Sequence, residues 1–154
     1  DHLQFFATAP GDGLQQAFES LSSAEGAVRQ RLKTEGLSFA ESEDHGFLTS
    51  CPSKLGSGGL QASVLLKLPL VCSLPDFKAS CGVLHPCIVR QLDSEPWGSV
   101  VKVALTAKVG QSEADVISRV AEACRTLVEQ EKLLQGAGDA TEVSSALANA
   151  VCSS

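Results

Sequence analysis

The residues best suited to chemistry form one short stretch in the middle of the chain. A thiol, Cys51, is followed by Pro52 and Ser53 and then by a glycine-rich loop, Gly56 to Gly59. The Ser53 hydroxyl and the loop amides favour a thiolate, which is the nucleophilic form of cysteine. The same amides could cradle a phosphate, but no G-K-[ST] sequence follows, so this is not a P-loop. The alternatives are a small residue packed at a tight turn and a flexible loop without a ligand.

A second group, Cys81, His85 and Cys87, raises the question of metal binding. Its spacing matches no zinc pattern, and Pro86 hinders convergence of the side chains. We therefore expect ordinary core or loop residues and no metal. None of the six cysteines forms a C-x-x-C pair. The even count could suggest disulfides, but a domain of this size and apolar content does not need them, so we expect free thiols in a reducing, cytoplasmic compartment.

Composition limits the class of protein. The chain has 154 residues, of which 44% are hydrophobic and 19% charged, which suits one domain with a core. The lack of an apolar run of about 18–20 residues predicts no membrane span. A net charge of −6 with scattered cations argues against binding to nucleic acid or to a membrane surface. The chain does not begin with Met, so we expect residues 1–154 to be a single domain cut from a longer protein.

Hydrophobic periodicity predicts the elements that hold these residues. We expect strands at 3–8, 60–68, 87–92 and 99–107, a helix at 14–34 and a helix from Ser112 to 135. Asp12 is predicted to cap the first helix, with Gln15 reaching back, and Ser112 with Asp115 to cap the second. Residues 69–75 and 93–98 are expected as loops, and weaker helices are expected at 76–84 and 139–151. This order predicts an α+β fold with a mainly antiparallel sheet and packed helices.

Three segments resemble the phosphagen (guanidino) kinase family, which includes creatine and arginine kinases. Residues 45–60 followed by 66–69 resemble the family pattern T-C-P-S-N-L-G-T-G-L-R and the strand that ends H-I-K-L-P. Residues 1–4 resemble the E-D-H-L-R strand, and residues 109–113 resemble the L-G-x-S-E start of the closing helix. The segments follow the family order across almost the whole chain. The resemblance implies a truncated C-terminal catalytic domain with the fold shared by guanidino kinases and glutamine synthetases.

The resemblance also implies a nucleotide site, and this sequence departs from it. Phosphoryl transfer needs cations fixed around the phosphates, and the family uses arginines there. Two of these arginines correspond to Gln4 and Gln61, the second after one inserted glycine, and the family histidine near the adenine corresponds to Leu65. Each lost charge-assisted contact would weaken phosphate binding by about 1.5–3 kcal/mol. The family's arginine-rich mobile loop has no counterpart.

Other family positions are retained. They are Cys51, Pro52, Ser53 and Gly56. The resemblance implies that the Cys51 thiol would lie beside the guanidino substrate, with a lowered pKa. The acidic residues that hold the guanidino group would lie before Asp1.

From the missing cations we expect a non-catalytic, pseudokinase-like domain that is not an enzyme, with the full-length protein left open. Its role would be protein interaction or scaffolding, including homodimerisation, without ATP binding or a cofactor. One alternative is a divergent ATP:guanidino or protein-arginine phosphotransferase whose other catalytic groups lie outside this chain. Another is a nucleotide sensor that does not transfer phosphate.

Overall fold

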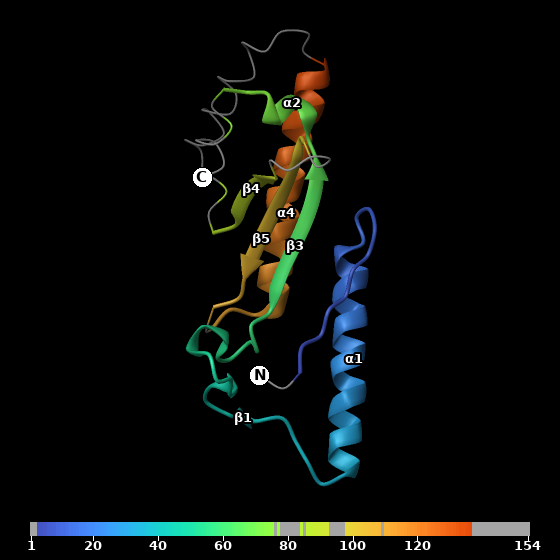
Figure 1. Cartoon of the computed structure of the whole chain (residues 1–154), viewed down its shortest axis with the longest axis vertical. Coiled ribbons are helices and arrows are strands. Elements are labelled where there is room, and N and C mark those ends of the chain that lie inside the picture. Colours follow the sequence, from blue (N-terminus) through green and yellow to red (C-terminus); the bar gives the residue numbers. More distant parts are fainter. Residues whose placement is uncertain are drawn as a thin grey trace. The chain divides into compact units, whose positions relative to one another are not determined.

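The computed structural model describes residues 3–75, 77, 84, 86–92, 98–108 and 110–136. In chain order the elements are α1 (Leu14–Thr34), β1 (Glu41–Ser42), β2 (Gly46–Phe47), a 3-10 helix (Pro52–Lys54), β3 (Gln61–Lys67), α2 (Pro69–Cys72), β4 (Ile88–Leu92), β5 (Val100–Thr106) and α4 (Glu113–Gly136) (Figure 1). The predicted α+β class is confirmed. The expected helix at 139–151, most of the expected helix at 76–84 and of the loop at 93–98, and both Cys81 and His85 lie outside the described residues.

Contacts divide the chain into two compact units. One contains Asp1–Gln61 and Thr106–Ile117, and the other contains Ala62–Leu105 and Ser118–Ser154. No helix in the described ranges combines the length and the apolar character needed to cross a bilayer.

The second unit is built on a three-stranded sheet with the order β3-β5-β4. Strands β4 and β5 are antiparallel, with Val89 opposite Val103. The Leu68 amide donates to the Ser99 carbonyl at 2.8 Å, and the Ala107 amide donates to the Leu60 carbonyl at 2.8 Å. These bonds flank β3 and β5 at opposite ends, so the two strands also run antiparallel. The expected antiparallel sheet is confirmed.

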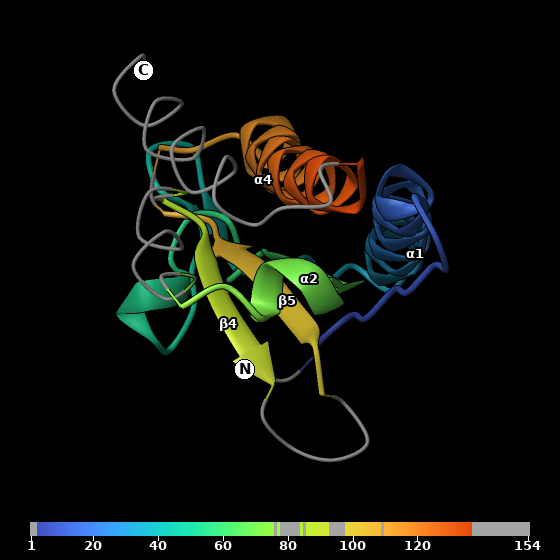
Figure 2. The same cartoon turned by 90° about the horizontal axis from the view of Figure 1, so that it is seen from above.

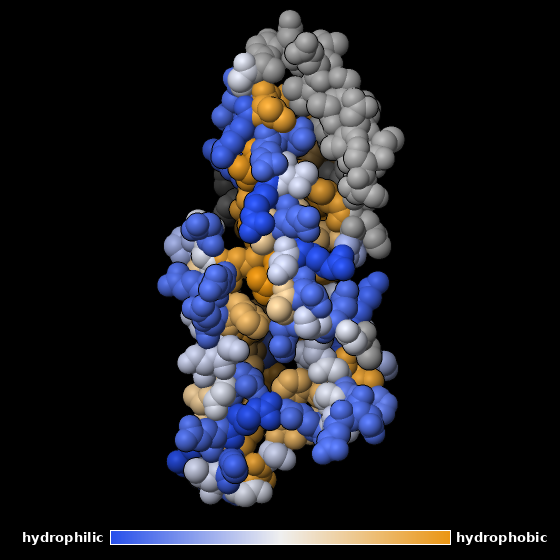
Figure 3. All heavy atoms as spheres, turned by 180° about the vertical axis from the view of Figure 1, so that it is seen from behind, coloured by the Kyte–Doolittle hydropathy of each residue, from blue (hydrophilic) through white to orange (hydrophobic). Residues whose placement is uncertain are grey.

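One face of this sheet is covered by α4 (Figure 2). Val101 and Val103 of β5 and Val120 of α4 are fully buried there, and Leu127 is 6% exposed. Burial of each such side chain contributes about 1.5–3 kcal/mol. The outward surface of α4 is mainly hydrophilic (Figure 3). Its exposed residues include Glu122, Arg125, Glu129 and Lys132.

The start of α4 follows the predicted cap. Ser112 Oγ accepts a hydrogen bond from the Asp115 amide at 3.1 Å and donates to Asp115 Oδ2 at 2.7 Å. The predicted cap of α1 is wrong, because Gly13 occupies the N-cap position and no side chain caps the helix. Since the Ala17 amide donates to the Gly13 carbonyl at 2.9 Å, the helix begins one residue later than an Asp12 cap requires.

Two further expectations are wrong. The described residues of the predicted strand at 3–8 form no strand, and Phe6 is 82% exposed. A strand needs a neighbour for its backbone groups, and no described strand pairs with this segment. The expected loop after β3 instead begins with the short helix α2, because Glu131 of α4 accepts hydrogen bonds from the Leu70 and Val71 amides at 3.0 and 2.8 Å.

Candidate functional site

The Cys51 thiol lies at the start of the 3-10 helix, on the surface of the first unit. Its Sγ is 3.0 Å from Ser53 Oγ. Hydrogen bonds from the Ser53 side chain and backbone, and then the nearby charge of Lys54, lower the pKa of Cys51. An exposed thiol whose anion is stabilised in this way is suited to react or to hold a cation.

We expect iodoacetamide to alkylate Cys51 at lower pH than an ordinary cysteine. Ser53→Ala should shift the rate–pH profile of Cys51 upward, because the thiolate loses its first hydrogen-bond donor. Ser57→Ala is the matched control, since the Ser57 hydroxyl accepts from the Gly59 amide instead. Peptide mass spectrometry follows each thiol separately. Burial raises the pKa of Cys124 to about 11, so Cys124 should lag behind Cys51. Identical Cys51 profiles in the wild type and Ser53→Ala would refute this assignment.

Strand β2 holds the loop that carries Cys51. Phe47 and Gly56 exchange both backbone hydrogen bonds, each at 3.0 Å. Gly56 has a φ of 86°, and Gly46, with a φ of 66°, lies so close that an added Cβ would meet the Gly56 carbonyl oxygen at 2.6 Å. These two glycines therefore allow the backbone before the Cys51 turn to lie close against the backbone after it.

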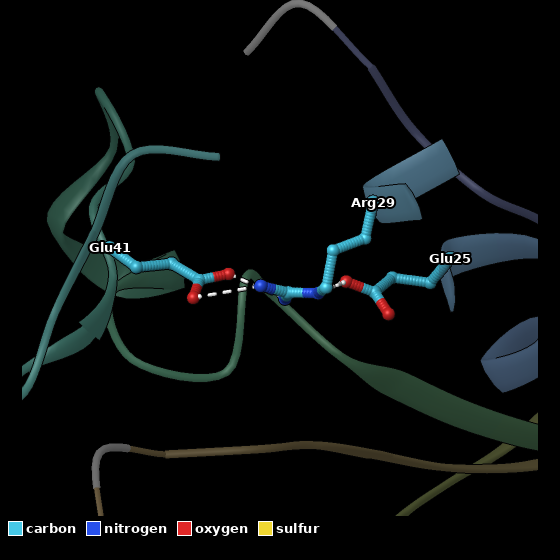
Figure 4. Close-up of polar contacts among 3 residues, drawn as sticks. All are labelled: Glu25, Arg29 and Glu41. Carbon is cyan, nitrogen blue, oxygen red and sulfur yellow. Dashed lines mark hydrogen bonds and ion pairs between the residues drawn. The ribbon is translucent and has the colours of Figure 1, made fainter. Parts of the chain in front are cut away.

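An arginine from α1 supports the same strand pair (Figure 4). Arg29 donates to both carboxylate oxygens of Glu41, at 3.0 and 2.6 Å, and through Nε to Glu25 at 2.9 Å. Its guanidinium carbon lies 5.1 Å from the ring centroid of Phe39 and 5.6 Å from that of Phe47. Arg29 thus connects α1 to β1 and, through Phe47, to the Cys51 loop. Sequence reasoning missed it, because only the Glu25–Arg29 spacing is visible without the fold.

The Arg29–Glu41 pair should make the first unit sensitive to acid. Arg29 lowers the pKa of Glu41, so its stabilisation is present above the ordinary glutamate range and lost as pH falls through the lowered value. We expect Arg29→Gln to lower the free energy of unfolding by about 0.5–1 kcal/mol at pH 7, because the pair is partly exposed.

Urea denaturation between pH 3 and pH 7 measures the effect of Arg29→Gln. Arg31→Gln is the control, since the Arg31 side chain pairs with Glu35 near the end of the same helix and is 78% exposed. An equal loss in both variants, or an Arg29→Gln effect that does not shrink in acid, would contradict the role given to Arg29.

The three positions at which this sequence departs from the family's nucleotide site lie in different parts of the structure. Gln4 is exposed in the irregular segment before α1. Gln61 and Leu65 are exposed on one face of β3, because side chains alternate along a strand and the intervening Ala62 is buried. The structure therefore brings Gln61 and Leu65 to the face opposite α4, and it brings Cys51 and Ser53 into contact. A role for these positions in nucleotide binding stays a prediction.

Sequence reasoning missed three cations on that face of the sheet: Lys67, Arg90 and Lys102. The alternation of β3 could have found Lys67, which follows Leu65 by two residues. The other two depend on strand register, which the sequence does not show. Of the three residues considered for metal binding, Cys87 is the one that the structure describes. Cys87 is buried, and its thiol donates a hydrogen bond to the Arg119 carbonyl at 3.6 Å.

Comparison with known proteins decides the family. Residues 1–134 match the family described as ATP:guanido phosphotransferase, C-terminal catalytic domain. The chain belongs to this family. The resemblance seen in the sequence is confirmed, and the ATP:guanido phosphotransferase fold accounts for the order of strands and helices.

Named relatives share this domain. A taurocyamine kinase from Schistosoma mansoni is 31% identical over 137 residues, which cover 88% of this chain and 18% of that protein. A protein-arginine kinase from Brevibacillus brevis is 28% identical over 138 residues, covering 86% and 37%. An arginine kinase from Turbo cornutus is 30% identical over 140 residues, covering 89% and 38%. The chain thus spans well under half the length of these curated relatives.

Solved structures agree on the fold. A crystal structure of lombricine kinase aligns with a TM-score of 0.70 and 22% identity, over 84% of this chain and 36% of that chain. The substrate-free taurocyamine kinase from Schistosoma mansoni aligns with a TM-score of 0.62 and 30% identity, over 83% and 18%.

These relatives correct one expectation. The inference that this domain is not an enzyme is wrong, because the chain belongs to a phosphotransferase family and its relatives are named as kinases. The inference relied on neutral residues at Gln4 and Gln61. The charges at these two positions do not include the cations of Lys67, Arg90 and Lys102, which lie on the same sheet.

Proposed function

We propose that this chain supplies the C-terminal catalytic part of an ATP:guanidino phosphotransferase. The reaction would move the γ-phosphoryl group of ATP to a guanidino nitrogen, in a small compound or in a protein arginine. An N–P bond forms while the bond from the γ-phosphorus to the ADP oxygen breaks. The groups that take the guanidino proton would lie outside this chain.

Family membership across residues 1–134 supports phosphoryl transfer as the reaction class. The Cys51 turn supports a guanidino group as the acceptor. A guanidino group is cationic before it reacts, and a thiolate is an anion that can hold such a cation by charge attraction. Cys51 is exposed, and Ser53 favours its anionic form. The single observation that carries the proposal is therefore the exposed Cys51 thiol, whose Sγ lies 3.0 Å from Ser53 Oγ in the turn that the family retains.

The test is a transfer assay on the full-length protein with radiolabelled Mg-ATP. Acceptors should include taurocyamine, lombricine, creatine, free arginine and an arginine-rich protein. We expect acceptor-dependent formation of ADP and of an acid-labile phosphorylated product with at least one of them. Cys51→Ser should lower kcat/KM by about tenfold or more, since hydroxyl groups do not ionise at neutral pH.

Cys72→Ser provides the matched control for the thiol. Cys72 is half-buried, and burial raises its pKa, so this variant should keep wild-type turnover. Failure of every acceptor to stimulate ADP formation would overturn the proposal. Equal turnover in Cys51→Ser and Cys72→Ser would remove the assigned role of the thiolate.

A further inference from the structure

The loop that carries Cys51 is closed at its base. We define the Cys51 loop as residues 48–55, and its base is the pair Phe47 and Gly56, which exchange two backbone hydrogen bonds. Inside the loop, the Lys54 amide donates to the Cys51 carbonyl at 3.0 Å, and this bond closes the 3-10 turn. The loop therefore maintains its own local shape, and the direction of the Cys51 side chain relative to the rest of the first unit depends on how the base is held.

The Phe47 side chain holds this base. A Cβ added to Gly58 would lie 3.4 Å from Phe47 Cδ2, so the ring packs against the glycine-rich segment that follows the loop. The ring also makes an edge contact with Phe39, with 5.9 Å between the two centroids. The guanidinium carbon of Arg29 lies 5.6 Å from the Phe47 centroid, and a cation over an aromatic face is attracted to it. Arg29 therefore contacts the ring whose backbone forms the base of the loop.

Arg29 is itself fixed by two carboxylates. Figure 4 shows its guanidinium between Glu25, on the same helix, and Glu41 of β1. Both Glu41 oxygens accept hydrogen bonds from the guanidinium, while Nε donates to Glu25. A planar guanidinium can bond to carboxylates at its edge while its face contacts aromatic rings, a geometry that the ammonium group of lysine does not offer. The Arg29 side chain is 46% exposed, so these bonds contribute little to stability, but together they fix the orientation of the guanidinium against Phe47.

We propose that Arg29 is a positioning residue for the guanidino acceptor. It holds Phe47 against α1 and β1, and so it determines where the Cys51 loop presents its thiol. This inference rests on the proposed function, because the acceptor is the group that Cys51 would hold. Arg29 acts without touching the acceptor, and it leaves in place the contact between Ser53 and the thiol. Removal of Arg29 therefore changes the placement of the thiol and not its acid–base chemistry, and a misplacement of about 1 Å near a reacting centre costs on the order of a hundredfold in rate.

The first experiment measures transfer kinetics on the full-length protein with the acceptor that supports transfer. Arg29→Gln should raise the KM for this acceptor and lower its kcat/KM by about tenfold, while the KM for Mg-ATP stays at the wild-type value because the Cys51 loop serves the acceptor. Arg29→Lys keeps the positive charge beside Glu41 but not the planar fork, so its kcat/KM should fall between those of Arg29→Gln and the wild type. Arg31→Gln removes equal charge from the same helix and should match the wild type.

The second experiment distinguishes the placement of the thiol from its chemistry. The rate–pH profile of Cys51 alkylation should keep its wild-type midpoint in Arg29→Gln, because the Ser53 hydroxyl remains, and the midpoint should shift in Ser53→Ala. A double variant, Arg29→Gln with Phe47→Leu, tests the route of the effect. Since both residues act through the same ring, the loss of kcat/KM in the double variant should be smaller than the product of the two single losses. Losses that simply multiply would show that the two residues act independently and would contradict the proposal.

A third measurement needs no transfer. Residue-resolved hydrogen exchange should show the Phe47 and Gly56 amides exchanging about two- to fivefold faster in Arg29→Gln than in the wild type, with the Lys54 amide unchanged because its partner lies within the loop. Unchanged exchange at the base, an unchanged acceptor KM, or a shifted alkylation midpoint in Arg29→Gln would each overturn the proposal and leave the proposed function standing. Absence of transfer with every acceptor would instead overturn the proposed function, and faster exchange at Phe47 and Gly56 would then still support the hold of Arg29 on the loop.

Discussion

Glu131→Ala is expected to lower the free energy of unfolding by about 3 kcal/mol. The Glu131 side chain is 5% exposed, and its two oxygens accept the amides of Leu70 and Val71 in the first turn of α2. Alanine would leave the buried Val71 amide and the partly buried Leu70 amide without this acceptor. A buried donor without a partner costs about 1–3 kcal/mol. Because α2 begins two residues after β3 ends at Lys67, the loss also loosens the end of β3.

Urea denaturation measures this loss, and two variants make the result specific. Glu129→Ala changes an exposed glutamate of the same helix and should shift the free energy of unfolding by less than about 0.5 kcal/mol. Glu131→Gln keeps one acceptor oxygen, so it should fall between the wild type and Glu131→Ala. Equal stability of Glu129→Ala and Glu131→Ala would show that the carboxylate does not hold α2.

Gly46→Ala is expected to disrupt the support of the Cys51 turn. The added Cβ would meet the Gly56 carbonyl oxygen at 2.6 Å and the Gly56 Cα at 3.0 Å, at a φ of 66°. Left-handed backbone costs alanine about 1–2 kcal/mol, and separating Gly46 from Gly56 strains the paired hydrogen bonds of Phe47. We expect a total loss of about 2–4 kcal/mol in the free energy of unfolding and an altered pH profile of Cys51 alkylation.

Gly26→Ala is the matched control for Gly46→Ala. Gly26 lies inside α1, and a Cβ there would meet nothing within 4 Å. Alanine in an exposed helix interior should raise the free energy of unfolding by about 0.5–1 kcal/mol and leave Cys51 reactivity unchanged. The two substitutions add the same methyl group, so opposite signs would identify backbone geometry as the cause. A Gly46→Ala protein with wild-type stability and wild-type Cys51 reactivity would show that the Gly46–Gly56 contact does not support this turn.

Local sequence patterns determined the elements that the chain forms by itself. The helical spacing of Leu14, Phe18 and Leu32 predicted α1, and Ser112 with Asp115 predicted the start of α4. The strand at 3–8 failed because β structure depends on a partner strand, and sequence periodicity shows only the alternation. Contacts across long sequence separations were not predictable, and the link from Glu131 to α2 is the clearest of them.

The candidate site shows the same difference between local contacts and contacts across long sequence separations. Cys51 and Ser53 are two residues apart, so the sequence predicted their contact, and the structure confirms it at 3.0 Å. Arg90 and Lys102 become neighbours only through strand register. An interpretation that weighed Gln4 and Gln61 alone therefore underestimated the positive charge on this sheet.

Acceptor protection of Cys51 tests the proposed function most directly. The full-length protein is treated with iodoacetamide in the absence and presence of saturating Mg-ADP and the guanidino acceptor that supports transfer, and each thiol is quantified by peptide mass spectrometry. Cys51 should be protected by the acceptor, because its exposed thiol is proposed to hold the guanidino group, whereas Cys72 should be alkylated at an unchanged rate. Equal alkylation of Cys51 with and without the bound acceptor would contradict the proposed function.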